Sequence, residues 1–152
     1  MMRVMVVEDE EMIRKGIVMA VDWAALDCIV VGEAANGEQA LAVAEDCQPT
    51  LIITDLKMPK MDGLEMVRRL REAGSRAYVI ILTAYDSFAY AQTAIRLGAV
   101  DFLLKPFHDG DLENAVLALQ KRIAAQTAPQ PEPLPGVKPG PKSRYVREAK
   151  VY

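Results

Sequence analysis

The chain has 152 residues, of which 51% are hydrophobic and 26% charged, proportions typical of a soluble globular domain that buries a real core. No apolar stretch approaches the ~20 residues of a membrane span and no signal-peptide pattern opens the chain, so we expect a cytoplasmic protein with no membrane partner. Residues 127–152 carry five basic and two acidic side chains, a net charge of +3. Because the whole chain has a net charge of −3, the first 126 residues have a net charge of −6. This acidic body argues against nucleic-acid binding by the first 126 residues. The two cysteines, Cys28 and Cys47, are too few for a disulfide framework, and we expect both to be buried.

Strand-like apolar runs alternate with helical patterns along the chain from residue 3. The first helical pattern, 10–21, predicts one buried face, formed by Met12, Ile13, Ile17 and Ala20. Five strand–helix units of ordinary length predict an α/β fold, a doubly wound parallel sheet with helices on both faces. The strand-like runs are 3–7, 28–32, 51–54, 78–83 and 102–104, and the other helical patterns are 37–44 (after the Asn36-Gly37 turn), 63–73, 86–97 and 111–125.

The composition changes after residue 126. Six of the nine prolines fall within residues 129–141, which predicts an extended, semi-rigid linker over 127–142. Residues 143–152 return to a helix-friendly pattern that stops after two or three turns, too few for a stable isolated helix. We therefore expect residues 1–126 to form one domain and residues 143–152 to begin a truncated second one. A frayed tail is the alternative.

Charged side chains follow three of the predicted strands at the point where each strand ends. Glu8 and Asp9 follow the first strand, Asp55 follows the third, and Lys105 follows the fifth. The carboxyl ends of neighbouring parallel strands meet at one edge, where open α/β sheets hold their functional sites. Three carboxylates at one point repel each other unless a cation lies among them, so these residues predict a hard divalent metal.

Magnesium fits this set of ligands, because it prefers one or two carboxylates together with water and substrate oxygens. The predicted ligands are Asp9, Asp55 and the backbone carbonyl of Lys57, with Glu8 binding through a water molecule. Asp55 is also a candidate nucleophile toward phosphorus, since a carboxylate can accept a phosphoryl group as an acyl phosphate. Mg²⁺ would then neutralise the charge that develops on the phosphoryl oxygens.

Two further side chains fit the same chemistry. Thr83 ends the fourth strand, where its hydroxyl could hydrogen-bond a phosphoryl oxygen, and Lys105 could pair with Asp55 before reaction and with a phosphoryl oxygen afterwards. Each motif taken alone has a simpler explanation. Glu8 and Asp9 could merely favour the positive end of the following helix, and Thr83 could be an ordinary β-branched residue at a strand end.

Together these motifs resemble the receiver domain of two-component response regulators. The motifs are Glu8-Asp9, Asp55 with Met58-Pro59 and Asp62-Gly63, Thr83-Ala84, and Lys105-Pro106, and the resemblance covers about residues 3–123. It implies a flavodoxin-like fold with strand order 2-1-3-4-5, Mg²⁺-dependent phosphorylation of Asp55 by the phosphohistidine of a sensor histidine kinase, and no enzymatic role beyond self-catalysed phosphorylation and dephosphorylation. It further implies that Thr83 and Phe102 act as the switch, reshaping the surface of the fourth helix, fifth strand and fifth helix. Phe102 has no hydroxyl, so only its packing could report that switch.

A finer resemblance connects the chain to receivers attached to AraC-type helix-turn-helix domains. It rests on Asp22-Trp23 and on residues 82–91 and 94–99, while residues 145–152 are similar to the opening of the first helix of such a DNA-binding domain. This resemblance implies a transcription factor that contacts DNA only through its absent C-terminal domain. On activation, the changed surface is expected to bind a second copy, giving a homodimer, or to release the downstream domain.

Two alternatives from other classes remain open. The first is a phosphatase of the haloacid dehalogenase type, which also uses an aspartyl nucleophile at a strand end. Such enzymes place a second Asp two residues after the nucleophile, where this chain has Lys57. The second is a stand-alone receiver that acts by protein contact without DNA, against which the basic segment after the predicted linker argues.

Overall fold

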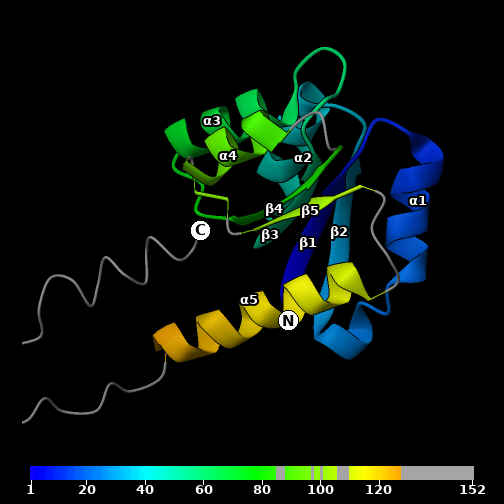
Figure 1. The fold of residues 1–152 in the computed structure, drawn as a ribbon, viewed down its shortest axis with the longest axis vertical. Coiled ribbons are helices and arrows are strands. Elements are labelled where there is room, and N and C mark those ends of the chain that lie inside the picture. Colours follow the sequence, from blue (N-terminus) through cyan, green and yellow to red (C-terminus); the bar gives the residue numbers. More distant parts are fainter. Residues whose placement is uncertain (85–87, 97, 100, 106–109, 128–152) are drawn as a thin grey trace, which may run out of the picture.

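The computed structural model describes residues 1–84, 88–96, 98–99, 101–105 and 110–127. Within these residues, strands and helices alternate along the chain (Figure 1). The strands are β1 (Met2–Val7), β2 (Cys28–Ala34), β3 (Leu51–Asp55), β4 (Tyr78–Thr83) and β5 (Asp101–Leu104). The α-helices are α1 (Glu11–Ala20), α2 (Gly37–Cys47), α3 (Gly63–Glu72), α4 (Phe88–Arg96) and α5 (Asp111–Thr127), and a short 3-10 helix, η1 (Ala24–Leu26), precedes β2.

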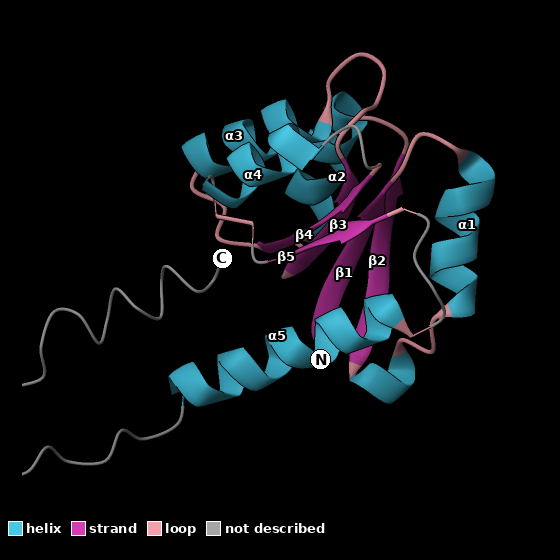
Figure 2. Ribbon diagram, in the orientation of Figure 1, coloured by secondary structure: helices cyan, strands magenta, loops and turns pink. Residues whose placement is uncertain are grey.

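The five strands form one parallel sheet in the order β2-β1-β3-β4-β5, as expected for a flavodoxin-like fold. The central strands β1, β3 and β4 are apolar on both faces and almost fully buried, because helices cover both sides of the sheet (Figure 2). The predicted fold class and strand order are confirmed.

The core consists of two apolar layers, one on each face of the sheet. Alternate residues of each strand point to opposite faces, so Met5 and Ile52 pack with α2 and α3, while Val4 and Ile53 pack with α1 and α5. Ile95 of α4 packs against the first of these layers. Helices α2, α3 and α4 therefore cover one face, and α1 and α5 cover the other (Figure 1).

The structure corrects the predicted buried face of α1. Ile17 is buried and Ile13 is packed against the core, but Met12 is 88% exposed and Ala20 is also exposed. The helix instead turns Val18 toward the core beside Ile17. Met12 lies on another side of the helix, whereas Ala20 shares the face of Ile13 and Ile17 but is the last residue of α1.

Element ends differ modestly from the sequence-based expectations. Strand β2 continues past Gly32 to Ala34 because its last residues pair with β1, and α5 continues to Thr127, the first residue of the predicted linker. Residues 86, 87 and 97 of the predicted fourth helix lie outside the described residues, as do 128–152, which hold the rest of the predicted linker and the predicted start of a second domain.

Cys28 is buried as predicted, whereas Cys47 is only partly buried because it lies in the last turn of α2. Trp23 is also buried, and its backbone carbonyl accepts the N–H of Cys28 where β2 begins. Among the described residues, no helix is long and apolar enough to cross a membrane.

Candidate functional site

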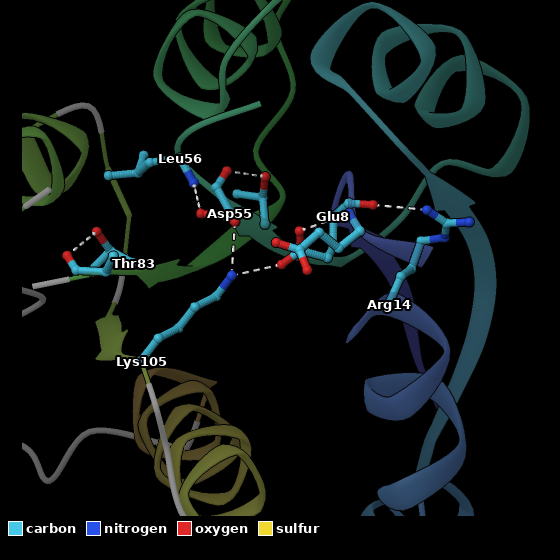
Figure 3. Close-up of polar contacts among 9 residues, drawn as sticks. Glu8, Arg14, Asp55, Leu56, Thr83 and Lys105 are labelled. Atoms are coloured by element: carbon cyan, nitrogen blue, oxygen red, sulfur yellow. Dashed lines mark hydrogen bonds and ion pairs between the residues drawn. The ribbon is translucent and has the colours of Figure 1, made fainter. Parts of the chain in front are cut away.

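The predicted charged residues converge at the carboxyl edge of the sheet. Asp55 is the last residue of β3, Glu8 and Asp9 follow β1, and Lys105 follows β5. β1 and β3 are neighbours, and β4 lies between β3 and β5, so these strand ends bring the four side chains to one place. Figure 3 shows Glu8, Asp55 and Lys105 pointing toward one another.

Three carboxylates form a compact cluster at this edge. One oxygen each from Glu8, Asp9 and Asp55 lies within 4.8 Å of the others. Glu8 and Asp55 are buried, whereas Asp9 is exposed, so the cluster is open on one side. Three hard oxygen donors around a position that solvent can reach fit Mg²⁺, which binds through one or two carboxylates and keeps several waters.

Lys105 is the cation that holds this cluster together. Its Nζ donates hydrogen bonds to Asp55 Oδ2 at 2.8 Å and to Glu8 Oε1 at 2.7 Å (Figure 3). Burial alone would lower the pKa of Lys105, but the hydrogen bonds to the two carboxylates outweigh burial and raise it. The ammonium is therefore held in its charged form. The contact with Asp55 was predicted, and the contact with Glu8 was not.

Every polar group of Glu8 has a partner. Its N–H donates to the carbonyl of Ala34 at 3.0 Å, and its Oε2 accepts the N–H of Glu10 at 3.1 Å. Its carbonyl accepts a hydrogen bond from Arg14 Nη1 at 2.8 Å. The side chain is nevertheless 0% exposed, and this burial raises the pKa of Glu8 to about 7 although the hydrogen bond from Lys105 opposes the shift. Glu8 is thus fixed in place at a considerable electrostatic cost.

The backbone around Asp55 is equally constrained. Asp55 Oδ1 accepts the N–H of Leu56 at 2.7 Å, and the Asp55 carbonyl accepts the hydroxyl of Thr54 at 2.8 Å. The N–H of Gly63 donates to the Leu56 carbonyl at 2.7 Å, and Asp62 caps α3 through a 2.8 Å bond to the N–H at position 65. These bonds turn the chain sharply from β3 into α3 and leave Asp55 Oδ2 facing Lys105.

The other predicted site residues lie as follows. Thr83 ends β4, is fully buried, and donates its hydroxyl to the carbonyl of Ala84 at 3.1 Å. Its own carbonyl accepts the N–H of Lys105 at 2.7 Å, which ties the ends of β4 and β5 together. Phe102 lies on β5, is partly buried, and packs on the core layer beneath α2, α3 and α4. Lys57 is exposed two residues after Asp55, and the role of its carbonyl as a ligand stays a prediction.

Comparison with known proteins matches residues 4–117 to the family model of the response regulator receiver domain. The chain belongs to this receiver family. It is 32% identical over 124 residues to the transcriptional regulatory protein YesN of Bacillus subtilis, an alignment that covers 82% of this chain and 33% of YesN. The chain spans a third to about half of the length of YesN and other curated relatives that it matches.

Solved structures give the same result. The receiver domain of the response regulator AraT from Geobacillus stearothermophilus has a TM-score of 0.77 and 37% identity, with 84% of this chain and 98% of that one covered. A two-component transcriptional regulator AraC from Clostridium phytofermentans has a TM-score of 0.74 and 27% identity, with 84% and 100% covered. The receiver fold and the family therefore rest on sequence and on structure independently.

Two residues near the acidic cluster of this receiver, Arg14 and Glu33, were not predicted from the sequence. Arg14 lies on α1 and Glu33 on β2, and neither follows a strand end. Arg14 Nε donates to Glu33 Oε1 at 3.2 Å while the same guanidinium holds the Glu8 carbonyl. The only signal in the sequence is the position of Arg14 near the start of the helix that follows Glu8, which by itself does not reveal a long-range contact.

Proposed function

We propose that this receiver domain is a phosphorylation-dependent switch in which Asp55 accepts a phosphoryl group from the phosphohistidine of a sensor histidine kinase. The observation that carries the proposal is the convergence of Asp55 with Glu8, Asp9 and Lys105. A carboxylate oxygen of Asp55 would bond to phosphorus as the bond from phosphorus to the histidine nitrogen breaks, and the released imidazole would take up a proton from solvent.

The residues around Asp55 would have separate roles. Asp9 and Asp55 would hold Mg²⁺ directly, with the carbonyl of Lys57 as a further ligand and Glu8 acting through water. When bound, Mg²⁺ would neutralise charge on the transferring phosphoryl oxygens. Lys105, held beside Asp55 before reaction, would pair with a phosphoryl oxygen afterwards.

Phosphorylation would add a charge of about −1.5 to −2 at the end of β3. Thr83, at the end of the adjacent strand, would rotate its hydroxyl from the Ala84 carbonyl toward a phosphoryl oxygen. Phe102 would then repack into the space that Thr83 leaves. These movements would change the surface formed by α4, β5 and α5.

The changed surface would control a transcription-factor output through dimerisation of this cytoplasmic protein. YesN is named as a transcriptional regulatory protein, and a structural relative as a two-component transcriptional regulator AraC, which supports this reading. The basic segment 143–152 would begin the AraC-type DNA-binding domain, after a linker over 127–142. The encoded chain beyond Tyr152 tests this directly: a helix-turn-helix pair is expected, and a stop codon would favour a stand-alone receiver.

Labelling by acetyl phosphate tests the phosphoacceptor. The wild-type chain should take up one phosphoryl group in the presence of Mg²⁺, and Asp55→Ala should take up none. Asp46→Ala, which removes an exposed carboxylate on α2, is the matched control and should label normally. Stoichiometric labelling of Asp55→Ala would place the acceptor elsewhere. Continuous hydrolysis of a generic phosphate ester would instead support the phosphatase alternative.

Sedimentation tests the proposed output. The complex with beryllofluoride, an analogue of the phosphoryl group, should self-associate more than the untreated protein. Equal sedimentation of the two forms would reject dimerisation as the consequence of phosphorylation.

A further inference from the structure

Arg14 hydrogen-bonds the backbone of the segment that carries two of the three clustered carboxylates, Glu8 and Asp9. Arg14 Nη1 donates a 2.8 Å hydrogen bond to the carbonyl of Glu8, the oxygen of the peptide that joins Glu8 to Asp9. Figure 3 shows the guanidinium approaching Glu8 from the side opposite to Lys105. The peptide that orients Asp9 is therefore held directly by a charged donor.

The guanidinium is itself held in position. Its Nε donates to Glu33 Oε1 at 3.2 Å, and the Arg14 side chain is only 13% exposed. Glu33 pairs in register with Val6 on the neighbouring strand, and Lys15 Nζ bonds both of its carboxylate oxygens at 3.0 and 3.1 Å. Arg14 thus connects α1, β2 and the end of β1 through polar contacts.

We propose that Arg14 is a positioning residue for the divalent cation, a role that rests on the proposed metal site. By fixing the carbonyl of Glu8, Arg14 fixes the plane of the Glu8–Asp9 peptide and hence the direction of the Asp9 side chain. The Asp9 side chain is exposed and interacts with the neighbouring Glu8 carboxyl, so the peptide that joins the two residues sets the direction of both. Without Arg14, the peptide could rotate and Asp9 would spend less time in ligating geometry.

A purely electrostatic role for Arg14 predicts the opposite sign. A positive charge beside three carboxylates repels a divalent cation, so its removal would strengthen metal binding. Glu33, which also pairs with Lys15, offsets part of that charge through the 3.2 Å ion pair and so reduces the repulsion. The orienting effect should therefore dominate, and loss of Arg14 should weaken binding.

Titration of the unphosphorylated protein with Mg²⁺ alone, followed by calorimetry and by the amide resonances of Asp9 and Asp55, distinguishes the two roles. Arg14→Gln should weaken Mg²⁺ binding by about tenfold, the lower end of the effect usual for residues that orient metal ligands. Arg14→Lys should also weaken it, since an ammonium keeps the charge but cannot bridge Glu33 and the Glu8 carbonyl with a planar fork.

Lys15→Gln is the matched control. It removes one positive charge at the adjacent position and one ion-pair partner of Glu33, as the Arg14→Gln variant does. Among the described residues, however, Lys15 has no hydrogen bond or ion pair with Glu8. Mg²⁺ affinity should therefore change less than about twofold. Glu33→Gln keeps an acceptor oxygen for Arg14 and should likewise change affinity little. Glu33→Leu, which removes the acceptor of Arg14 Nε, should weaken Mg²⁺ binding, and it tests the same link without altering Arg14, should the Arg14 variants unfold.

Three results would overturn the proposal. Wild-type affinity in both Arg14 variants would exclude a positioning role. Tighter binding in Arg14→Gln with unchanged binding in Arg14→Lys would show that Arg14 acts only through its charge. A wild-type protein that binds no divalent cation would remove the proposed metal site itself, and would be recognised before any variant is compared.

Discussion

Gly63 lies directly against the backbone carbonyl of Asp55: a Cβ atom at residue 63 would come within 2.2 Å of that oxygen. No side chain can occupy this position unless the backbone moves, and the backbone that must move belongs to the proposed phosphoacceptor. The start of α3 and the end of β3 are thus packed as one unit. A glycine is needed at position 63 for this close approach, because it lacks a Cβ.

Gly63→Ala should therefore destabilise the fold by about 1–3 kcal/mol, the usual cost of forcing extra volume into a closely packed position. It should also slow phosphorylation of Asp55 by displacing its peptide. Gly16→Ala is the matched control, because nothing lies within 4 Å of a Cβ placed at this position inside α1. That change should stabilise the protein by about 0.5–1 kcal/mol. Urea unfolding measures both, and an equal effect of the two substitutions would contradict the packing argument.

Glu8 should make the folded state less stable as pH rises toward neutrality. Burial raises its pKa from the ordinary value of 4.5 to about 7, so between these values the folded chain binds more protons than the unfolded chain. The stability contributed by protonated Glu8 is complete below about pH 4.5 and is lost as pH rises through about 7. Glu8→Gln should remove this decrease in unfolding free energy, which amounts to about 1–3 kcal/mol between pH 5 and pH 8. Unfolding free energies of both proteins at these two pH values test the prediction, which parallel pH profiles would contradict.

Lys105→Met should expose the dependence of the acidic cluster on its ammonium. The substitution leaves Glu8 and Asp55 without their hydrogen-bonded cation, so it should destabilise the protein by about 1–3 kcal/mol at pH 8. The effect should be smaller at pH 6, where protonation of Glu8 relieves the repulsion. Thermal unfolding at the two pH values measures it. Arg68→Met, which disrupts an exposed ion-pair network on α3, should show little dependence on pH in this range.

Asp9→Asn should stabilise the metal-free protein and reduce its response to magnesium. Removing one of three clustered carboxylates relieves repulsion, which should raise the unfolding free energy by about 0.5–1 kcal/mol when divalent ions are chelated. Excess Mg²⁺ should stabilise the wild type more than the variant, since a bound ion stabilises only the state that binds it. Urea unfolding in chelator and in Mg²⁺ gives both quantities. Equal stabilisation of the two proteins by Mg²⁺ would mean that Asp9 is not a ligand.

The sheet and the convergence of Asp9, Asp55 and Lys105 were predictable because parallel strands obey a simple rule. Each strand is a short apolar run, and consecutive runs separated by helices must end at the same edge. A residue that directly follows such a run is therefore placed in space by its position in the sequence alone. Glu8 and Thr83 were placed at this edge by the same rule.

Contacts that depend on helix rotation or on side-chain reach could not be predicted in this way. The rotation of α1 on the sheet decides that Ile17 is buried and Met12 exposed, and helical spacing alone allowed either. The same rotation brings Arg14 to the Glu8 carbonyl and to Glu33, which is 19 residues away along the chain. The hydrogen bond between Lys105 and Glu8 spans 97 residues and needs the strand order as well as the strand ends.

Trp23, buried where β2 begins, is the single tryptophan of the chain and lies at the end of the sheet remote from Asp55. Its fluorescence should consequently report loss of the native state while staying insensitive to ion occupancy and to chemistry at the opposite rim. Stability can thus be followed by fluorescence and ligand affinity by calorimetry on the same unlabelled protein, without one signal interfering with the other.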